Sequence, residues 1–283
     1  MPTDVAERAR RVAADLDADA LVSIGGGSAT GTAKAVAMVR DVPIVAVPTT
    51  YAGSEATCVW GLTEGGVKST GRDERVLPRV VVYDTALFVG IPTTLAVSSG
   101  LNAIAHAIDA MWAPRSDPIT RALGGEGLRA LAAGLPAVAE HPDLGGGHDD
   151  ALYGAYLAAV AFDGAGSGLH HTICHVLGGM FDLPHADTHA VVIQHVLDAN
   201  APHAPDAARR IAGALGVIDA SAGLRELRRR LAAPVALRDL GMPEGGVRSA
   251  VEPILAAAPP SNPAPVTSTS ITTLLLAAWS GHE

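Results

Sequence analysis

Residues 20–39 read ALVSIGGGSATGTAKAVAMV, and this stretch contains the strongest indication of the fold class. A short apolar run ends in three glycines, Gly25 to Gly27, after which the chain resumes with a helical pattern. A buried strand that turns through glycine into a helix is typical of an α/β unit. Such a turn leaves backbone N–H groups and the positive helix end facing a cleft, which suits a pyrophosphate, but it also serves close packing. On this motif alone both interpretations remain open.

Two further apolar runs extend the same pattern. VPIVAVPTT, residues 42–50, and RVVVYD, residues 79–84, are predicted to be buried strands of one parallel sheet. From Thr93 onward, Ala- and Leu-rich helical periods dominate and no convincing strand is found. The sequence therefore predicts an α/β domain over residues 1–92 and a helical domain over residues 93–283.

Two polar segments interrupt the helical part. They read DLGGGHDD at residues 143–150 and APPSNPAPVTSTS at residues 258–270. Runs of Gly, Pro and Ser favour turns and loops. We expect both segments to be surface connections rather than domain linkers.

The composition excludes several classes of function. The 283 residues are 48% hydrophobic and 17% charged, which favours an ordered globular protein. The formal net charge of -9, without a run of Lys or Arg, disfavours binding to nucleic acid. Cys58 and Cys174 form no CxxC motif, and no apolar run approaches membrane-spanning length. We expect a soluble cytoplasmic protein that binds neither nucleic acid nor membrane.

A second polar loop, PTTYAGSEAT, occupies residues 48–57 after a predicted strand. Parallel α/β sheets bind ligands beyond the carboxyl ends of their strands, so these hydroxyl groups suit the ribose or nicotinamide of a dinucleotide. An ordinary turn rich in Thr and Ser has the same composition and is favoured if the loop is considered alone.

Histidine is concentrated in LHHTICHVLGGMFDLPHADTH, residues 169–189, which holds five of the chain's eleven histidines. Polar residues spaced i, i+4 share one helix face, and three such pairs in apolar helices predict a shared polar cleft with a function. His170, His195 and His203 break this spacing and are predicted to lie at the surface or to support the cluster. The three pairs are Asn102 and His106, His171 and His175, and His185 and His189.

Six sequence blocks together resemble the iron-containing (group III) alcohol dehydrogenase superfamily, and within it the maleylacetate reductases. The blocks are GGGSATGTAKA, PTTYAGSEAT, GGVKSTGRDERVLPRVVVYD, GLNAIAHAIDAMWAP, LHHTICHVLGG and FDLPHADTHAVV. Their order is more specific than any single block, and they cover nearly the whole chain. The resemblance implies a partial Rossmann-like parallel-sheet domain followed by a helical domain, a dehydroquinate synthase-like fold, with a cleft between them.

The resemblance also implies roles for particular residues. The family's positions that bind the pyrophosphate match Gly25, Gly26, Gly27 and Ser28. The positions that line the rest of the nicotinamide cofactor, NADH or NADPH, match Thr49, Thr50, Thr57 and Lys68. The metal positions of the superfamily match Asn102, His106, His171 and His185.

One of these metal positions departs from the pattern. Metal-dependent members carry an aspartate where this chain has Asn102. The amide lacks the negative charge and the strong oxygen ligand of a carboxylate, so three neutral imidazoles would have to hold a cation alone. Maleylacetate reductases resemble this chain in carrying Asn there and generally work without a metal. We therefore expect that no metal is required and that the inherited positions serve substrate binding and proton transfer.

The implied reaction is reduction of the C=C bond of maleylacetate, or of a similar oxo-enoate, to 3-oxoadipate during catabolism of aromatic compounds. Hydride addition builds charge on the ketone oxygen, and histidines can stabilise that charge and return a proton. The catalytic candidates, without division of roles, are His106, His171, His175 and His185. The substrate-binding candidates for a dicarboxylate are Asn102, Lys68, Arg72 and His189, with Arg115 as a further cation; solvated surface charge is the alternative for the cations.

Members of the superfamily carry further strands and helices before the segment that matches MPTDVAERA. Because those strands contribute to the adenosine pocket, we expect weak dinucleotide binding and, from an exposed sheet edge, a homodimer. Two alternatives to the reductase follow. One is a non-redox isomerase or lyase that uses the histidine cleft, and the other is a catalytically inactive relative.

Overall fold

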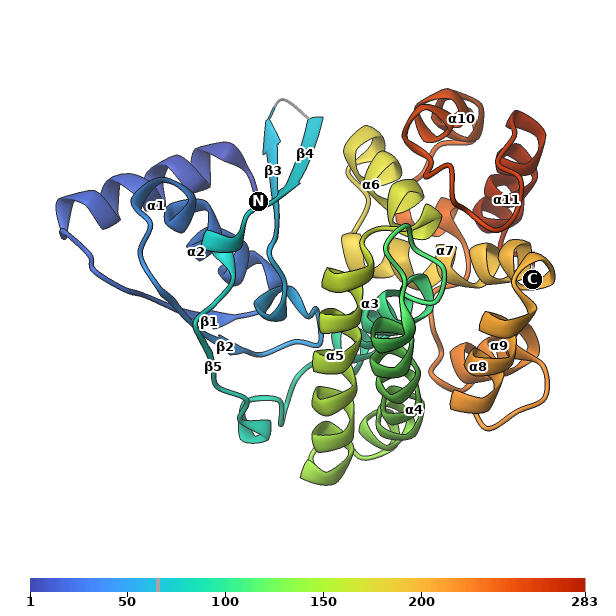
Figure 1. Ribbon diagram of the computed structural model, residues 1–283, viewed down its shortest axis with the longest axis horizontal. Helices are drawn as coiled ribbons and strands as arrows, with labels where there is room; N and C mark the ends of the chain where they lie inside the picture. The colour runs from blue at the N-terminus through green and yellow to red at the C-terminus, as the bar shows by residue number, and fades with distance from the viewer. Residues whose placement is uncertain (65–66, 283) are drawn as a thin grey trace.

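The computed structural model describes residues 1–64 and 67–282, and the side chains at positions 64, 67 and 68 lie outside the description. The N-terminal part contains both strands and helices, whereas the larger C-terminal part is built from helices (Figure 1). The predicted fold class, a partial parallel-sheet domain followed by a helical domain, is confirmed. The division at residues 92 and 93 stays a prediction, although a helix begins at Thr93 as expected.

The N-terminal part contains a three-stranded parallel sheet and a separate hairpin. Its elements are α1 (Thr3–Asp15), β1 (Leu21–Gly25), α2 (Gly27–Arg40), β2 (Ile44–Pro48), β3 (Val59–Glu64), β4 (Val67–Arg72) and β5 (Val80–Val81). The sheet order is β1-β2-β5, and the register places Gly25 opposite Pro48. The glycine turn and the PTT loop therefore leave the sheet side by side at the carboxyl ends of β1 and β2.

Two features of this part differ from the sequence prediction. The strand expected over residues 79–84 pairs only at Val80 and Val81. The antiparallel hairpin of β3 and β4 was not expected, because GGVKSTGR contains small and charged residues instead of an apolar alternation.

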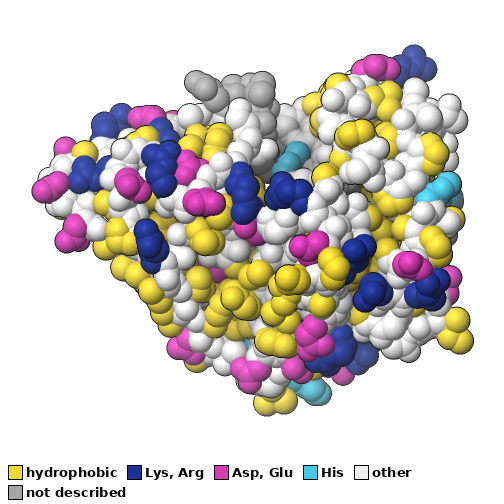
Figure 2. Space-filling view, viewed as in Figure 1, with side chains coloured by type: hydrophobic (Ala, Val, Ile, Leu, Met, Phe, Trp, Pro, Cys, Tyr) yellow, Lys and Arg dark blue, Asp and Glu magenta, His cyan; other side chains and the backbone are white. Residues whose placement is uncertain are grey.

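One face of the parallel sheet is covered by helices. Helix α2 packs on β1 and β2, and α1 packs on α2. On the opposite face Val22 and Ile24 are 67% and 66% exposed. Figure 2 shows hydrophobic side chains at the surface along the lower edge of this part of the molecule.

The C-terminal part holds the larger hydrophobic core. Its helices are α3 (Thr93–Asp109), α4 (Pro118–Glu140), α5 (Gly145–Ala165), α6 (Leu169–Phe181), α7 (His185–Asn200), α8 (Pro205–Ala214), α9 (Ala220–Arg230), α10 (Gly246–Ala257) and α11 (Ser268–Ser280). Among the described residues, no helix is both long and apolar enough to cross a membrane.

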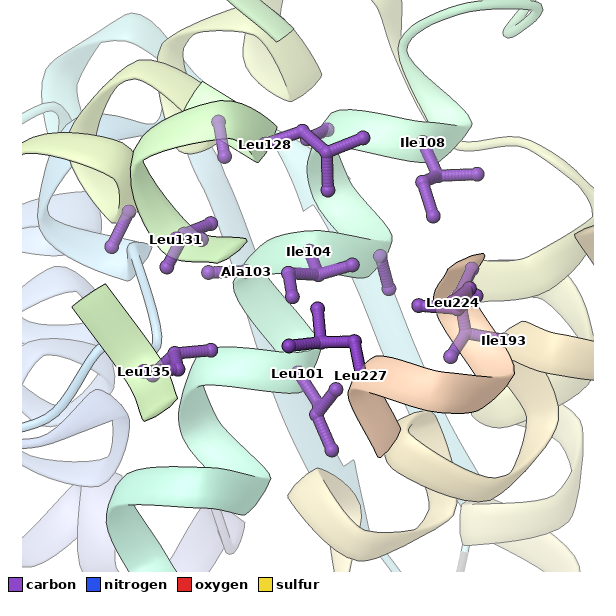
Figure 3. Packing of buried hydrophobic residues seen from close by; sticks show 14 of the residues in the cluster. Leu101, Ala103, Ile104, Ile108, Leu128, Leu131, Leu135, Ile193, Leu224 and Leu227 are labelled. Carbon is purple, nitrogen blue, oxygen red and sulfur yellow. The ribbon is translucent and has the colours of Figure 1, made fainter. Parts of the chain in front are cut away.

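Helix α3 lies at the centre of this core. Every residue from 96 to 109 is buried, so the helix is surrounded by others on all sides. Figure 3 shows Leu101, Ile104 and Ile108 of α3 packed among side chains from α4, α7 and α9. A polar residue carried by α3 is therefore placed inside the protein, where it must find a partner or a ligand.

Helices α4 and α5 pack closely because glycines line their contact. A Cβ added at Gly134 would lie 2.6 Å from Ala151 N, and one at Gly154 would lie 2.7 Å from Gly127 O. At the start of α5, a Cβ at Gly147 would lie 2.9 Å from Val138 N. The prediction that residues 143–150 form a surface connection is thus wrong from Gly145 onward, because these glycines permit close contact between two helices.

A second core joins the helices that follow. Leu177 of α6, Val192 of α7, Ile254 of α10 and Leu275 of α11 are fully buried in it. The Pro-rich segment predicted as a connection runs outside regular structure as far as Thr267, whose side chain accepts a hydrogen bond from Ser270 N and so begins α11.

Candidate active site

The glycine turn after β1 opens helix α2 toward the second loop. Gly25 has a φ of 140°, which favours glycine, and Gly26 is the N-cap of α2. A Cβ added at Gly26 would lie 2.9 Å from Thr50 Cγ2, whereas one at Gly27 would lie 3.5 Å from Ala52 Cβ. The first N–H groups of a helix have no partner within it, so the exposed Ser28 and its neighbours present donors to an anion.

The predicted cofactor residues of the second loop separate into two groups. Thr49 and Thr50 are half-buried beside the glycine turn, and Thr49 N donates to Gly25 O at 3.2 Å. Thr57 is buried, and its side-chain and main-chain oxygens accept hydrogen bonds from Lys34 Nζ at 3.1 and 2.7 Å. Thr57 therefore holds Lys34 in place instead of lining an open cofactor site.

Lys34 is a functional candidate that the sequence did not reveal. It is 1% exposed and donates a further hydrogen bond to Val59 O at 2.8 Å. Burial lowers the pKa of Lys34 to about 8, while the nearby Glu55 acts in the opposite direction. Burial also raises the pKa of Glu55, which accepts a hydrogen bond from Tyr83 Oη at 3.0 Å. This buried network joins α2 to the loop after β2.

Gly53 brings the second loop into contact with the histidines. Its φ of 73° lies in the left-handed region, and a Cβ added there would lie 2.7 Å from Ala159 Cβ and 3.5 Å from His106 Nδ1. Only glycine allows the loop to approach α3 and α5 this closely. The sequence analysis did not single out Gly53, because its importance depends on a partner 53 residues further along the chain.

The three predicted polar pairs meet in one cluster. The ring of His171 stacks on that of His106 with centroids 5.0 Å apart, and Phe162 lies 4.3 Å from His171. His189 lies 4.9 Å from His171 and 4.4 Å from His185. His175 completes the group, 6.1 Å from His171. The expected convergence of α3, α6 and α7 is therefore observed.

The cluster runs from the protein interior to its surface. His106, His171 and His189 are buried, His175 is half-buried and His185 is exposed. Asn102 is 4% exposed, and its Oδ1 has no hydrogen-bond partner among the described residues, nor has His106 Nδ1. Buried polar atoms of this kind are normally satisfied, so the inner end of the cluster is built to receive a polar ligand.

Three buried histidines of the cluster are kept neutral. Burial lowers the pKa of His106 to about 4, and it lowers the pKa values of His170 and His189 well below the usual range. These imidazoles are therefore neutral near pH 7 and offer N–H donors and nitrogen acceptors without carrying charge.

His171 has a buried carboxylate partner. Asp109 is fully buried, and its Oδ2 lies 2.8 Å from His171 Nδ1 and accepts a hydrogen bond from Gly168 N at 2.9 Å. Burial raises the pKa of Asp109, and the surrounding N–H donors, including that of Trp112, act in the opposite direction. Asp109 was not predicted, because its partners lie some 60 residues further along the chain.

His170 takes the second of the two places predicted for it, in support of the cluster. It is fully buried, and its Nε2 lies 2.9 Å from His189 Nδ1, so it belongs to the cluster rather than to the surface. His195 is also buried, at 7% exposure, whereas His203 is exposed as predicted. His170 can support the cluster although it breaks the i, i+4 spacing, because α6 is contacted on more than one face.

Two of the three predicted cations bind protein atoms, and the side chain of the third is not described. Arg72 Nη1 forms an ion pair with Asp163 Oδ1 at 2.6 Å, and Arg115 donates to the carbonyl oxygens of Asp163 and Gly164. Both arginines therefore bind the end of α5. Lys68 lies in β4, but its side chain is outside the described residues.

Comparison with known proteins now bears on this site. The family profile described as "Fe-containing alcohol dehydrogenase family, C-terminal" matches residues 96–279, and "Iron-containing alcohol dehydrogenase" matches residues 1–85. The chain belongs to the iron-containing alcohol dehydrogenase family. This is a family of oxidoreductases, and its pattern covers both the sheet with the glycine turn and the helices that carry the histidines.

Close relatives within the iron-containing alcohol dehydrogenase family are maleylacetate reductases. The enzyme of Sphingobium indicum is 46% identical over 281 residues, which are 99% of this chain and 80% of the relative. An iron-containing alcohol dehydrogenase from Corynebacterium glutamicum has a TM-score of 0.97 at 53% identity, covering 100% of this chain and 80% of that one. The maleylacetate reductase from Rhizobium sp. strain MTP-10005 has a TM-score of 0.92 at 41% identity, covering 99% and 80%.

The family name implies iron, and the residues here do not fit it. The donor set at the family's positions is an amide and three imidazoles, with no carboxylate to offset the charge of a divalent cation. The ligand atoms of His170, Cys174 and His189 do lie within 4.8 Å of one another. A cation bound by His170 Nε2 and His189 Nδ1 would leave the other nitrogen of each ring, His170 Nδ1 and His189 Nε2, carrying hydrogen. Metal-bound histidines normally donate that hydrogen to an acceptor, but neither nitrogen meets an acceptor among the described residues.

Proposed function

We propose that the protein reduces the C=C bond of maleylacetate, or of a closely similar oxo-enoate, to 3-oxoadipate with NADH or NADPH. The observation that carries this proposal is the closeness of Gly53 to the histidine cluster, where an added Cβ would lie 3.5 Å from His106 Nδ1, because the loop after β2 then borders the inner end of the cluster. The likeness to maleylacetate reductases over nearly the full chain supports the choice of substrate.

The bound nicotinamide cofactor supplies a hydride to the alkene carbon that is β to the ketone. The alkene electrons move toward the ketone, whose oxygen becomes an enolate oxygen, and a proton then adds to the neighbouring carbon. The protein must therefore stabilise one oxyanion and deliver one proton.

Different residues of the cluster are suited to stabilising the oxyanion and to delivering the proton. His106 is buried with Nδ1 unsatisfied, so it binds the ketone oxygen as a neutral imidazole that donates an N–H. The unsatisfied Oδ1 of Asn102 is an acceptor, so Asn102 can add to this site only by donating from Nδ2. His171 delivers the proton, since Asp109 stabilises its positively charged form. His175 and His185, at the exposed end, line the entrance for substrate.

The test is titration of the purified protein with NADH and NADPH, followed by nicotinamide fluorescence, and then assay of nicotinamide oxidation with maleylacetate. We expect binding of at least one dinucleotide and turnover that depends on maleylacetate. A folded protein that binds small dicarboxylates but no dinucleotide would exclude the reductase and favour a non-redox reaction at the same histidines. Binding of neither ligand would favour the inactive relative.

A further inference from the structure

Asp109 occupies a position in which both carboxylate oxygens meet N–H donors. Oδ2 accepts a hydrogen bond from Gly168 N at 2.9 Å and lies 3.5 Å from His171 N, and Oδ1 lies 3.4 Å from Trp112 Nε1. Gly168 is the N-cap of α6, so a side chain of α3 satisfies the start of another helix. A Cβ at Gly168 would lie 2.3 Å from Oδ1, so the close approach of Asp109 to the start of α6 requires glycine there.

This arrangement determines where the hydrogen of His171 lies. Oδ2 also lies 2.8 Å from His171 Nδ1. A carboxylate oxygen has no hydrogen to donate, so Oδ2 accepts a hydrogen bond from His171 Nδ1, as it does from the main chain. Nδ1 therefore carries the hydrogen, and Nε2 is the proton-exchanging atom on the other side of the ring. Phe162 and His106, with centroids 4.3 and 5.0 Å away, hold the plane of the ring.

We propose that Asp109 is a positioning residue that fixes the tautomer and orientation of His171, so that Nε2 faces the substrate site and exchanges the proton of the reaction. The role in catalysis rests on the proposed reductase function, whereas the tautomer does not. The same carboxylate also begins α6, so helix position and proton transfer depend on one side chain.

The direct test is nitrogen NMR of protein labelled with ¹⁵N-histidine, in which the two tautomers give different shifts. The signals of His171 are identified by their loss in His171→Gln. We expect hydrogen on Nδ1 in the wild-type protein and loss of this preference in Asp109→Asn. Hydrogen on Nε2 in the wild-type protein overturns the proposal, and this measurement needs no stable Asp109 variant.

Kinetics distinguish positioning from a structural role alone. In Asp109→Asn we expect kcat to fall by about 100-fold, with the KM values for maleylacetate and NADH changing far less. Trp112→Phe is the matched control, because it removes another donor to Asp109 and leaves the bond to His171 in place. Its kcat should stay within about threefold of the wild type.

Thermal unfolding of the variants completes the test. A lower Tm in Asp109→Asn with unchanged kcat and tautomer would show that Asp109 only caps α6, and would overturn the proposal. Wild-type protein with the expected tautomer but no reductase activity would exclude the proposed function and leave the positioning of His171 intact.

Discussion

Gly26 and Gly27 are neighbours, but the fold requires glycine at only one of them. A side chain at Gly26 collides with Thr50, whereas a Cβ at Gly27 makes ordinary contact with Ala52. A substitution at Gly26 therefore alters packing and ligand approach together, and one at Gly27 separates the two effects.

We expect Gly27→Ala to weaken NADH binding by about tenfold or more, because a methyl group obstructs the approach of a phosphate to the N-terminus of α2. Its Tm should be unchanged or higher, since Ala favours a helix. Gly26→Val should lose both affinity and stability. Titration followed by nicotinamide fluorescence, together with thermal unfolding, measures these effects; equal NADH affinity in Gly27→Ala and wild type would mean that the turn serves packing alone.

Asn102, in place of a carboxylate, is expected to lower the affinity of the site for a divalent metal. Protein purified without added metal should contain far less than one equivalent of iron or zinc, and chelators should leave reductase activity intact. Asn102→Asp should bind a divalent cation more tightly if His106, His171 and His185 converge on it. Elemental analysis and calorimetric titration test both statements, and stoichiometric metal in the wild-type protein would contradict the first.

Individual residues of the candidate site were predictable from sequence where their position depends on spacing within one helix. The pairs led by Asn102, His171 and His185 follow this rule. Asp109 and Gly53 were missed because each acts on a residue more than 50 positions away, and no local pattern marks such a contact. For His170 the sequence left two places open, the surface or a supporting position, because the spacing rule considers one face of a helix.

At the scale of elements, the α4–α5 contact depends on the absence of side chains. We expect Gly154→Ala to destabilise the protein by about 1–3 kcal/mol, because the methyl group meets Gly127 O and the helices must separate. Gly178→Ala on α6 is the control, since no atom lies within 4 Å of a Cβ there, and it should be neutral or stabilising. Denaturant unfolding measures both, and similar midpoints for the two variants would contradict the prediction.

Secondary structure was predictable where apolar runs are uninterrupted. Strands β1 and β2 and the helices from α3 onward follow from this signal. The hairpin of β3 and β4 was missed because it is stabilised by pairing between its strands and not by an apolar face. The start of α5 was missed because glycines that usually end a helix here allow contact with α4.

At the scale of the whole molecule, buried neutral histidines make the fold sensitive to acid. The pKa values of His106 and His195 are lowered to about 4, and those of His170 and His189 are also lowered. Between pH 6.5 and about 4 the unfolded chain binds protons that the folded protein does not bind. Each such histidine should therefore reduce the free energy of unfolding by about 1.4 kcal/mol per pH unit as the pH falls.

Denaturant unfolding at a series of pH values measures this slope. His195→Gln is the matched variant, because residue 195 lies outside the proposed site and glutamine does not titrate. We expect a shallower slope between pH 6.5 and 4 in this variant, and parallel curves for variant and wild type would show that His195 does not contribute.

Gly53 has a mechanical consequence for the molecule. Because the loop rests on Ala159 and His106 without space for one methyl group, the N-terminal part cannot slide across the helices at this point. Rotation of that part is therefore expected to pivot at Gly53, with the largest displacement at the distant helix α1 and almost none beside His106. Such a pivot would let the outer parts of the molecule move while Gly53 and His106 keep their distance.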